Sequence, residues 1–216
     1  MNQVNYTPTD LFPGSGFVQS TVPEQFREEI LKEIEETKDS EEHDYTGGLV
    51  GAIKREFALP KLTDNDEFRT FLKLLVNAYN EHFNDVIERY KDIQGELIPR
   101  KGFWVNHQSK GEYNPVHHHS GMYSFVIWIK IPYDLQEEKN LFPNNPSPRG
   151  IGSFSFIYHC DDIQTYAIDV DQSYEWEIIM FPSWRSHTVA PFLTSDDTRI
   201  SIAGNLTKAD PSGIIG

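Results

Sequence analysis

The spacing of apolar residues changes from a helical period to a strand period about halfway along the chain. Between residues 64 and 94, apolar side chains recur three and four positions apart, as on one face of an α-helix: Phe68, Phe71, Leu72, Leu75, Tyr79, Phe83, Val86, Ile87 and Tyr90. A shorter helix is expected after Pro23, with Phe26, Ile30 and Ile34 on its apolar face. Aromatic stripes at this spacing are typical of packing faces, so we expect helices that support a core, with a break near Asn80 in the longer one.

From residue 101 onward, runs rich in β-branched and aromatic residues predict strands at 101–107, 123–133, 150–158, 163–170, 174–181 and 198–206. Turn-forming residues separate these runs. Many short strands of this kind predict a jelly roll or barrel. The segment 142–150 is too rich in proline for a central strand. We expect it to be a surface connection, with a lid over the site as the alternative.

Length and composition narrow the class of protein. A chain of 216 residues is long enough for one sizeable core. We expect a single α+β domain, mostly β, with a helical support region at 1–98, a β core at 99–208 and a tail at 209–216. A formal charge of −14 without a compact basic patch argues against a nucleic-acid surface.

The number of cysteines and the length of the apolar runs indicate in which cellular compartment the protein is expected. The single cysteine, Cys160, cannot form an internal disulfide, so nothing indicates an oxidising compartment. The first ten residues lack the pattern of a signal peptide. The longest apolar run, Tyr123 to Ile131, is too short to cross a bilayer. We therefore expect a cytoplasmic protein, of a bacterium or a phage-infected cell, without a membrane partner.

Histidines are the most informative candidates for chemistry. His117, His118 and His119 precede an apolar strand, and His187 follows much later. Side chains alternate along an extended chain, so His117 and His119 should share a face while His118 points away. With His187 they could hold one face of a metal ion. The alternatives are a solvent-facing polar turn for the run and a hydrogen-bonded core position for His187.

Arg199 and Ser201 lie on the last expected strand. Alternation places them together with Ala203 on one face, and Ile200 and Ile202 on the other. A fixed cation beside a hydroxyl suits a carboxylate ligand. A buried arginine needs an anion, and no acidic residue of this strand supplies one. The alternative is an ion pair with a carboxylate from another part of the chain.

In their order, these motifs resemble the iron(II)- and 2-oxoglutarate-dependent oxygenases, particularly bacterial and phage members related to prolyl 4-hydroxylases. The matching pieces are Leu11-Phe-Pro, Asn114-Pro-Val-His-His-His-Ser-Gly121, Phe181-Pro-Ser-Trp-Arg-Ser-His187 and Arg199-Ile-Ser-Ile-Ala-Gly-Asn205. The resemblance covers the second half of the chain well and the first half weakly. It implies a double-stranded β-helix, a cupin-like jelly roll supported by N-terminal helices.

The resemblance also implies contacts to the cosubstrate. Arg199 matches the residue that holds the distal carboxylate of 2-oxoglutarate, and Ser201 is expected to assist it. Asn106 and Tyr123 are further candidates for contacts to the same molecule. Three tryptophans are candidates for lining the substrate pocket, with core packing as the alternative for each: Trp104, Trp128 and Trp184.

For the metal, the resemblance implies His117 and His187 as the first and last ligands of Fe(II). The usual triad is His-x-Asp or His-x-Glu with a distant histidine, whereas His119 stands here at the carboxylate position. A neutral imidazole neither lowers the positive charge of the site nor braces a bound water. The favoured hypothesis is that all three histidines bind iron.

Two alternatives for the metal site stay open. His119 could be the first ligand with Gly121 at a vacant position, as in the halogenases of this superfamily. A carboxylate from elsewhere, such as Asp134 or Asp161, could complete the ligand set, although neither lies at the matching strand position.

The resemblance implies a non-haem oxygenase that uses Fe(II), 2-oxoglutarate and O2. It would hydroxylate a peptidyl substrate, such as a prolyl residue, or a small molecule, releasing succinate and CO2. One rival is a three-histidine cupin-type dioxygenase that does not use 2-oxoglutarate, against which Arg199 and Ser201 argue. The other is a non-catalytic jelly-roll module for binding, for example a virion-associated one.

Overall fold

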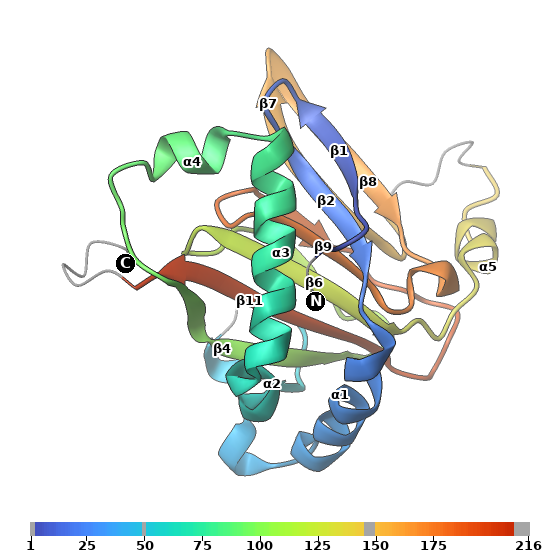
Figure 1. Ribbon diagram of the computed structural model, residues 1–216. Coiled ribbons are helices and arrows are strands. Elements are labelled where there is room, and N and C mark those ends of the chain that lie inside the picture. Colours follow the sequence, from blue (N-terminus) through green and yellow to red (C-terminus); the bar gives the residue numbers. More distant parts are fainter. Residues whose placement is uncertain (1–2, 49–50, 145–149, 210–216) are drawn as a thin grey trace.

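Two antiparallel sheets form the body of the protein, in a computed structural model that describes residues 3–48, 51–144 and 150–209 (Figure 1). The larger sheet has seven strands, in the spatial order β1 (Thr7–Phe12), β2 (Ser15–Thr21), β9 (Glu177–Pro182), β6 (Tyr123–Lys130), β11 (Arg199–Lys208), β4 (Leu97–Gln108) and β3 (Glu56–Ala58). The smaller has the order β5 (Asn114–His117), β10 (His187–Val189), β7 (Ser153–Cys160) and β8 (Asp162–Asp169). The expected α+β, mostly β jelly roll is confirmed.

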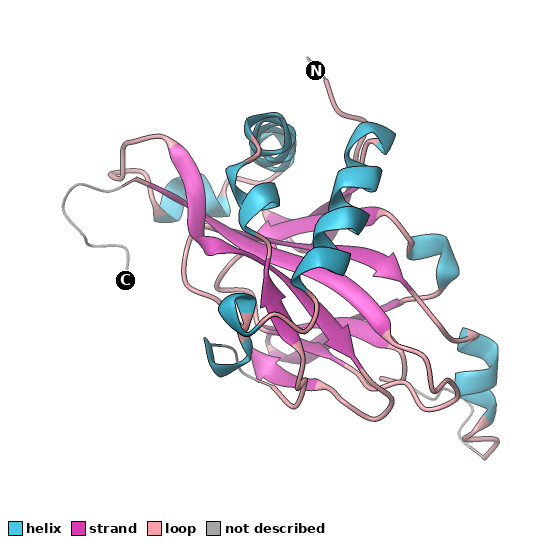
Figure 2. Cartoon of the chain, turned by 90° about the horizontal axis from the view of Figure 1, so that it is seen from below, coloured by secondary structure: helices cyan, strands magenta, loops and turns pink. Residues whose placement is uncertain are grey.

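Of the five helices in the described residues, the first four pack their apolar residues in the core on the outer face of the larger sheet, whereas the fifth lies beside the inter-sheet core. The helices are α1 (Glu24–Thr37), α2 (Pro60–Asp64), α3 (Asp66–His82), α4 (Asp85–Arg89) and α5 (Leu135–Asn140), with 3-10 turns at Glu41–His43, Thr46–Gly48 and Gln172–Tyr174. Figure 2 shows the longest helices on one side of the strands. None of the helices in the described segments is long and apolar enough to cross a membrane.

The long helix expected at 64–94 is in fact two helices. Asn65 caps α3 by accepting a hydrogen bond from the backbone N–H of Phe68, a typical helix start. The break comes at Phe83, whose backbone is extended, three residues beyond the expected position at Asn80. Because Phe83 and Val86 are both buried, the apolar period continues across the break and hides it in the sequence.

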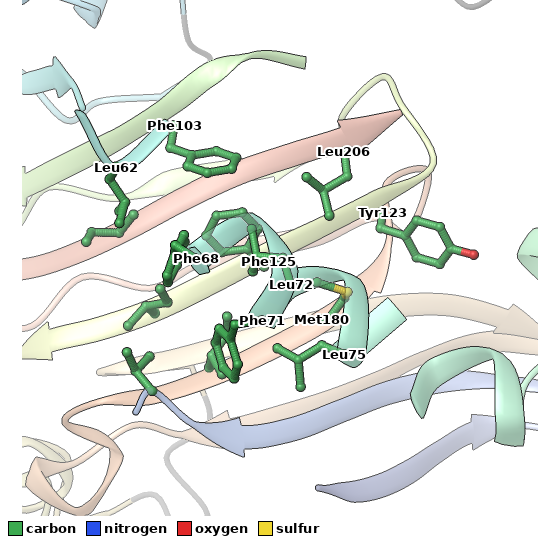
Figure 3. Packing of buried hydrophobic residues seen from close by; sticks show 14 of the residues in the cluster. Leu62, Phe68, Phe71, Leu72, Leu75, Phe103, Tyr123, Phe125, Met180 and Leu206 are labelled. Atoms are coloured by element: carbon green, nitrogen blue, oxygen red, sulfur yellow. The ribbon is translucent and has the colours of Figure 1, made fainter. Parts of the chain in front are cut away.

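A core of aromatic and aliphatic side chains joins α3 to the larger sheet. On the helix side it contains Phe68, Phe71, Leu72 and Leu75, and on the sheet side Phe103, Tyr123, Phe125, Met180 and Leu206 (Figure 3). Gly204 makes room for this packing, since a Cβ there would lie 2.3 Å from the Phe103 ring and 2.7 Å from the Phe125 ring. The aromatic stripe of the sequence is thus a packing face, as predicted.

A second core fills the space between the two sheets. Trp128, Phe154, Phe156, Ile179 and Phe181 are buried there. The central strands of the larger sheet therefore bury both faces, with successive side chains entering the helix-side core and the inter-sheet core in turn. The candidate metal ligand His187 borders this second core, where its ring stacks on that of Phe154.

The N-terminal region contributes strands as well as helices, which the sequence did not indicate. β1 and β2 form a hairpin that pairs with β9, and β3 pairs with β4. The sequence pattern of β1 and β3 is weak, because β1 is a partly exposed edge strand and β3 has three residues. The division at 98 and 208 stays a prediction. The lid hypothesis for 142–150 depends on residues 145–149, which lie outside the described part, as do 210–216 of the tail.

Candidate metal and cosubstrate site

Three histidines meet at the end of the smaller sheet. β5 ends at His117 and β10 begins at His187, and the two residues are direct partners in the antiparallel ladder. Their ring centroids lie 4.2 Å apart. His119, held by a hydrogen bond from its backbone N–H to the carbonyl of Ser183 (2.8 Å), lies 5.0 Å from the first ring and 5.1 Å from the second. Their candidate ligand atoms all lie within 4.8 Å of one another.

Backbone carbonyls fix the tautomers of two of these rings. Nδ1 of His117 is 2.7 Å from the carbonyl oxygen of Pro115, and Nδ1 of His187 is 2.9 Å from that of Arg185. A carbonyl can only accept, so each Nδ1 carries the hydrogen and each Nε2 keeps its lone pair. A carbonyl behind the ring is also the usual support of a metal-bound histidine.

Burial keeps all three imidazoles neutral. It lowers the pKa of His117, lowers that of His119 to about 3, and lowers that of His187, which is 2% exposed, well below its usual range. Mutual repulsion among the histidines acts in the same direction. The neutral form is the one that ligates a metal. His118 is exposed and lies outside this cluster, as expected from the alternation.

The two acidic residues considered as substitutes for the missing carboxylate lie elsewhere. Asp134 caps α5 by accepting from the backbone N–H groups of Gln136 and Glu137. Asp161 occupies the β7–β8 turn at a φ of 62°. Both assignments are therefore wrong. Gly121 does not line the histidine pocket, and its carbonyl accepts from Tyr90, so the vacant-position hypothesis gains no support.

Arg199 is buried among neutral acceptors. It is 2% exposed, and its Nε donates to Oε1 of Gln108 (3.0 Å), its Nη1 to the hydroxyl of Tyr133 (3.0 Å), and its Nη2 to the carbonyl of Ala190 (3.1 Å). Within the described part of the chain, no carboxylate forms an ion pair with it. The expected alternative, an internal acidic partner, is thus not found there. A buried guanidinium without an anion favours an anionic ligand.

A cavity of about 50 Å³ lies beside the histidines, between the sheets. Its lining comes from both sheets and from the loop before β3: Ile53, Glu56, Trp104, Asn106, Gln108, Asn114, His117, His119, Val126, Phe154, His187, Val189, Ser201 and Ala203. Asn106 and Ser201 are ladder partners on β4 and β11, and Nδ2 of Asn106 donates to Oγ of Ser201 (3.4 Å). Polar groups from distant segments therefore share one wall.

Tyr123 points away from this cavity. Its hydroxyl donates to Oδ1 of Asn80 on α3 (2.8 Å), and its ring packs in the helix-side core next to Tyr79. The prediction that Tyr123 contacts the cosubstrate is therefore wrong. The prediction assigned β6 residues to the wrong face of the sheet, since the odd-numbered residues of β6, such as Phe125 and Ile127, face the helices.

Of the three tryptophans considered, Trp104 lines the cavity, with its ring centroid 5.9 Å from that of His119. Trp128 packs in the inter-sheet core. Trp184 packs against Tyr90 of the helix side. For the last two, the pocket assignment is wrong and the expected alternative, core packing, is what the structure shows.

Three residues of this region escaped the sequence analysis. Gln108 and Tyr133 hold the guanidinium of Arg199, and Glu56 lines the cavity. Gln108 has the same strand parity as Trp104 and Asn106, so extending the alternation by two residues would have found it. Glu56 gave no signal, because a three-residue strand has no detectable period.

Comparisons with known proteins agree with this site. Residues 102–205 match the family model described as "Putative 2OG-Fe(II) oxygenase". None of the curated proteins compared with the chain matches it.

Solved structures show the same fold at low identity. A Pseudomonas putida prolyl-4-hydroxylase is 13% identical, with 90% of this chain and 93% of that chain covered and a TM-score of 0.56. A Trichoplax adhaerens prolyl hydroxylase, in complex with a hypoxia inducible factor peptide, is 13% identical over 90% and 84% of the chains, with a TM-score of 0.50. HygX of Streptomyces hygroscopicus, with nickel, 2-oxoglutarate and hygromycin B bound, is 9% identical over 92% and 85%, with a TM-score of 0.50.

The matched segment 102–205 contains every histidine of the cluster and also Arg199. The fold brings the three histidines into one cavity, and Gln108, which accepts from Arg199, lines the same cavity. Residues 102–205 are thus similar to oxygenases that use iron(II) and 2-oxoglutarate, and the chain shares the fold of the two prolyl hydroxylases compared with it.

Proposed function

We propose that the protein is a hydroxylase that uses Fe(II), 2-oxoglutarate and O2 on a peptidyl or small-molecule substrate. The observation that carries the proposal is the pairing of three neutral, convergent imidazoles with a buried guanidinium that has no anionic partner in the described structure. A metal and a carboxylate are the two ligands that these donor sets fit. The matched family uses both.

Different residues of the chain would bind the metal and the cosubstrate. Nε2 of His117 and of His187 is free to bind the metal, because each Nδ1 is held by a carbonyl. Arg199 donates to Ala190, three residues beyond His187, a span of roughly 10 Å of extended chain. The guanidinium group therefore lies at a distance from the metal ligands that a short dicarboxylate can span, and it can orient such a molecule by binding the carboxylate that is distant from the metal.

The side chain of Gln108 occupies two of the N–H donors of the Arg199 guanidinium group. Its Oε1 accepts from both Nε and Nη2, which is the pair of donors that a carboxylate would engage. An incoming carboxylate would replace this amide and gain a charge-assisted contact in its place. When bound, iron and 2-oxoglutarate supply the oxidising chemistry with O2, while Val126, Phe154 and Val189 give the cavity apolar walls that keep water away.

The substrate class rests on the similar structures. Two of them are described as prolyl hydroxylases, one with a peptide bound, and a third holds hygromycin B. A peptidyl-prolyl substrate and a small polar molecule are therefore the two classes to screen first. Three histidines in place of two and a carboxylate also support a second candidate, a three-histidine dioxygenase that does not use 2-oxoglutarate.

An anaerobic titration of metal-free protein with iron(II) and then 2-oxoglutarate tests the proposal, read from the visible charge-transfer band of the chelate. We expect the band in the wild type and no iron binding in His187→Ala. Arg199→Met should still bind iron, but its affinity for 2-oxoglutarate should fall about 10- to 150-fold, since a hydrogen bond to a charged group contributes about 1.5–3 kcal/mol. Tyr123→Phe, on the other face of the sheet, is the matched control and should behave as the wild type.

Two outcomes would contradict the proposal. Tight iron binding without the band would favour the three-histidine dioxygenase. No iron binding in a folded wild type would leave a jelly-roll module without this chemistry.

A further inference from the structure

Glu56 places a carboxyl group in the wall of the histidine cavity. It lies on the edge strand β3, directly opposite Asn106 of β4, which is itself opposite Ser201 of β11. Its neighbour Phe57 packs in the helix-side core, so Glu56 faces the inter-sheet side. The side chain is 3% exposed, and it is the acidic side chain in the lining formed by the described residues.

The wall around Glu56 offers acceptors that lack donors. Across the described structure, the Glu56 carboxyl group makes no side-chain hydrogen bond, and Oδ1 of Asn106 and Oδ1 of Asn114 are buried without a partner. In the structure, Nδ2 of Asn106 donates to the carbonyl of Ser201 (3.4 Å), which can only accept, and this orientation leaves Oδ1 as the open atom. Buried polar groups are normally paired, so two open amide oxygens in the same cavity lining as an unpaired carboxyl group point to a missing donor.

The same geometry redirects the role of Asn106. An amide oxygen is an acceptor, and an anionic cosubstrate offers acceptors as well. Asn106 therefore presents the wrong atom to 2-oxoglutarate and the right atom to a hydrogen-bond donor.

The charges around Glu56 favour a cation. Burial raises its pKa to about 8, and the carboxylates of Glu112 and Asp44 act in the same direction. Among the described residues, no cation offsets these two carboxylates. An ionised carboxylate here is unstable alone and is stabilised by an opposite charge placed next to it.

We propose that Glu56, Asn106 and Asn114, here called the acceptor wall, bind a primary ammonium group of the substrate. This inference rests on the proposed function and names its substrate class: an amine, either free or on a side chain, that reaches the metal cavity. When the ammonium ion binds, Glu56 gives up its proton to solvent, and its carboxylate together with the two amide oxygens then matches the three N–H donors of the ion. The cavity is small, about 50 Å³, so a group that enters it has to be compact, as an ammonium group is.

Calorimetric titration of the protein loaded with iron(II) and 2-oxoglutarate, without oxygen, tests the acceptor wall. The probes are linear alkylammonium ions from methyl to hexyl, each paired with the alcohol of the same length. We expect at least one ammonium ion to bind at least tenfold more tightly than its alcohol. Glu56→Gln, which keeps the shape of the side chain, should lose at least tenfold of that affinity.

Glu112→Gln is the matched control, because Glu112 lies outside the cavity lining and its carboxylate accepts from the backbone N–H of Ser109. It should change the ammonium affinity less than threefold. Asn106→Leu is an independent second variant and should also weaken the ammonium ion while sparing the alcohol. Thermal melting of each variant verifies that it is folded.

The outcomes separate this inference from the function on which it rests. If the charge-transfer band never forms in the wild type, the proposed function fails and the acceptor wall fails with it. If the band forms and no ammonium ion exceeds its alcohol tenfold, the inference alone is overturned. Full ammonium affinity in Glu56→Gln would also overturn it, because the amine would then be held by another group, such as the metal.

Discussion

The two faces of the larger sheet differ in how completely their groups are paired. On the face toward α3, Phe103 and Phe125 pack edge to face at 5.0 Å and the layer is a continuous apolar core. On the face toward the smaller sheet, the residues next in sequence, Trp104 and Val126, line a cavity. Successive residues of one strand thus serve stability on one side and binding on the other. A residue's role in this fold follows from its strand parity more than from its type.

His107 is the exception on the helix-covered side. It is 5% exposed, its ring packs edge-on against Phe57, and its Nε2 has no hydrogen-bond partner. Burial lowers its pKa to about 4, so it is neutral and behaves as an aromatic core residue. A single unpaired ring nitrogen differs from the group of open acceptors on the cavity side, which surround a space.

The comparison is tested most strongly by Phe125→Ala. Removing this ring, 1% exposed and in contact with Phe68 and Phe103, should lower the free energy of unfolding by about 3–5 kcal/mol. The affinities for iron and 2-oxoglutarate should not change. Denaturant unfolding and the anaerobic titration measure the two quantities. Val126→Ala, one residue along and facing the cavity, is the control with a smaller loss of stability.

A change of more than tenfold in 2-oxoglutarate affinity in folded Phe125→Ala would contradict the separation of the two faces, because packing against α3 would then determine the cavity.

Glu56→Gln should show the next largest effect, and its sign depends on pH. The folded wild type holds a proton on Glu56 up to a pKa of about 8, whereas the unfolded chain releases it near the ordinary value of 4.5. Between these values the unfolded state binds fewer protons, so wild-type stability falls as pH rises. The variant lacks this loss and should exceed the metal-free wild type by about 2–4 kcal/mol above pH 8, with no difference below pH 4.5.

Unfolding free energies of the metal-free proteins at a series of pH values provide the measurement. A constant difference across the pH range would show that Glu56 ionises normally in the folded protein, and would remove the electrostatic argument for the acceptor wall.

Ser201→Ala concerns the cavity side alone. Ser201 is expected to assist Arg199, and one neutral hydrogen bond contributes about 0.5–1.5 kcal/mol, so 2-oxoglutarate affinity should fall about 2- to 12-fold. Ile202→Val, the next residue on the opposite face, should instead lower stability by about 0.5–1.5 kcal/mol and leave that affinity unchanged. If Ser201→Ala changed only stability and Ile202→Val changed only the 2-oxoglutarate affinity, the faces assigned to these two residues of β11 would be contradicted.

The sequence predicted the fold class and the histidine cluster because both depend on local patterns with a clear order. Alternation placed His117 and His119 on one side, and placed Arg199 and Ser201 together. It failed at β6, since a strand buried on both faces has no polar side to mark its phase, and Tyr123 and Trp128 were assigned to the wrong environments.

Contacts between distant short elements were beyond the sequence. β3, β5 and β10 have three or four residues each, too few for a period, yet they carry Glu56, His117 and His187. The partners of Arg199 come from β4 and from the segment after β6. Such groupings depend on sheet order, which alternation along one strand does not contain.

Tyr123→Phe should show the smallest effect and marks the boundary between the two faces. Its hydroxyl donates to Asn80, and losing one such bond should lower stability by about 0.5–1.5 kcal/mol. Because the ring faces α3, the affinity for 2-oxoglutarate should equal that of the wild type, and comparing unfolding with the anaerobic titration separates the two effects. A loss of 2-oxoglutarate affinity would place the Tyr123 hydroxyl in the cavity and reverse the phase of β6. Since Val126 and Trp128 share that phase, the cavity wall and the inter-sheet core would both have to be rebuilt.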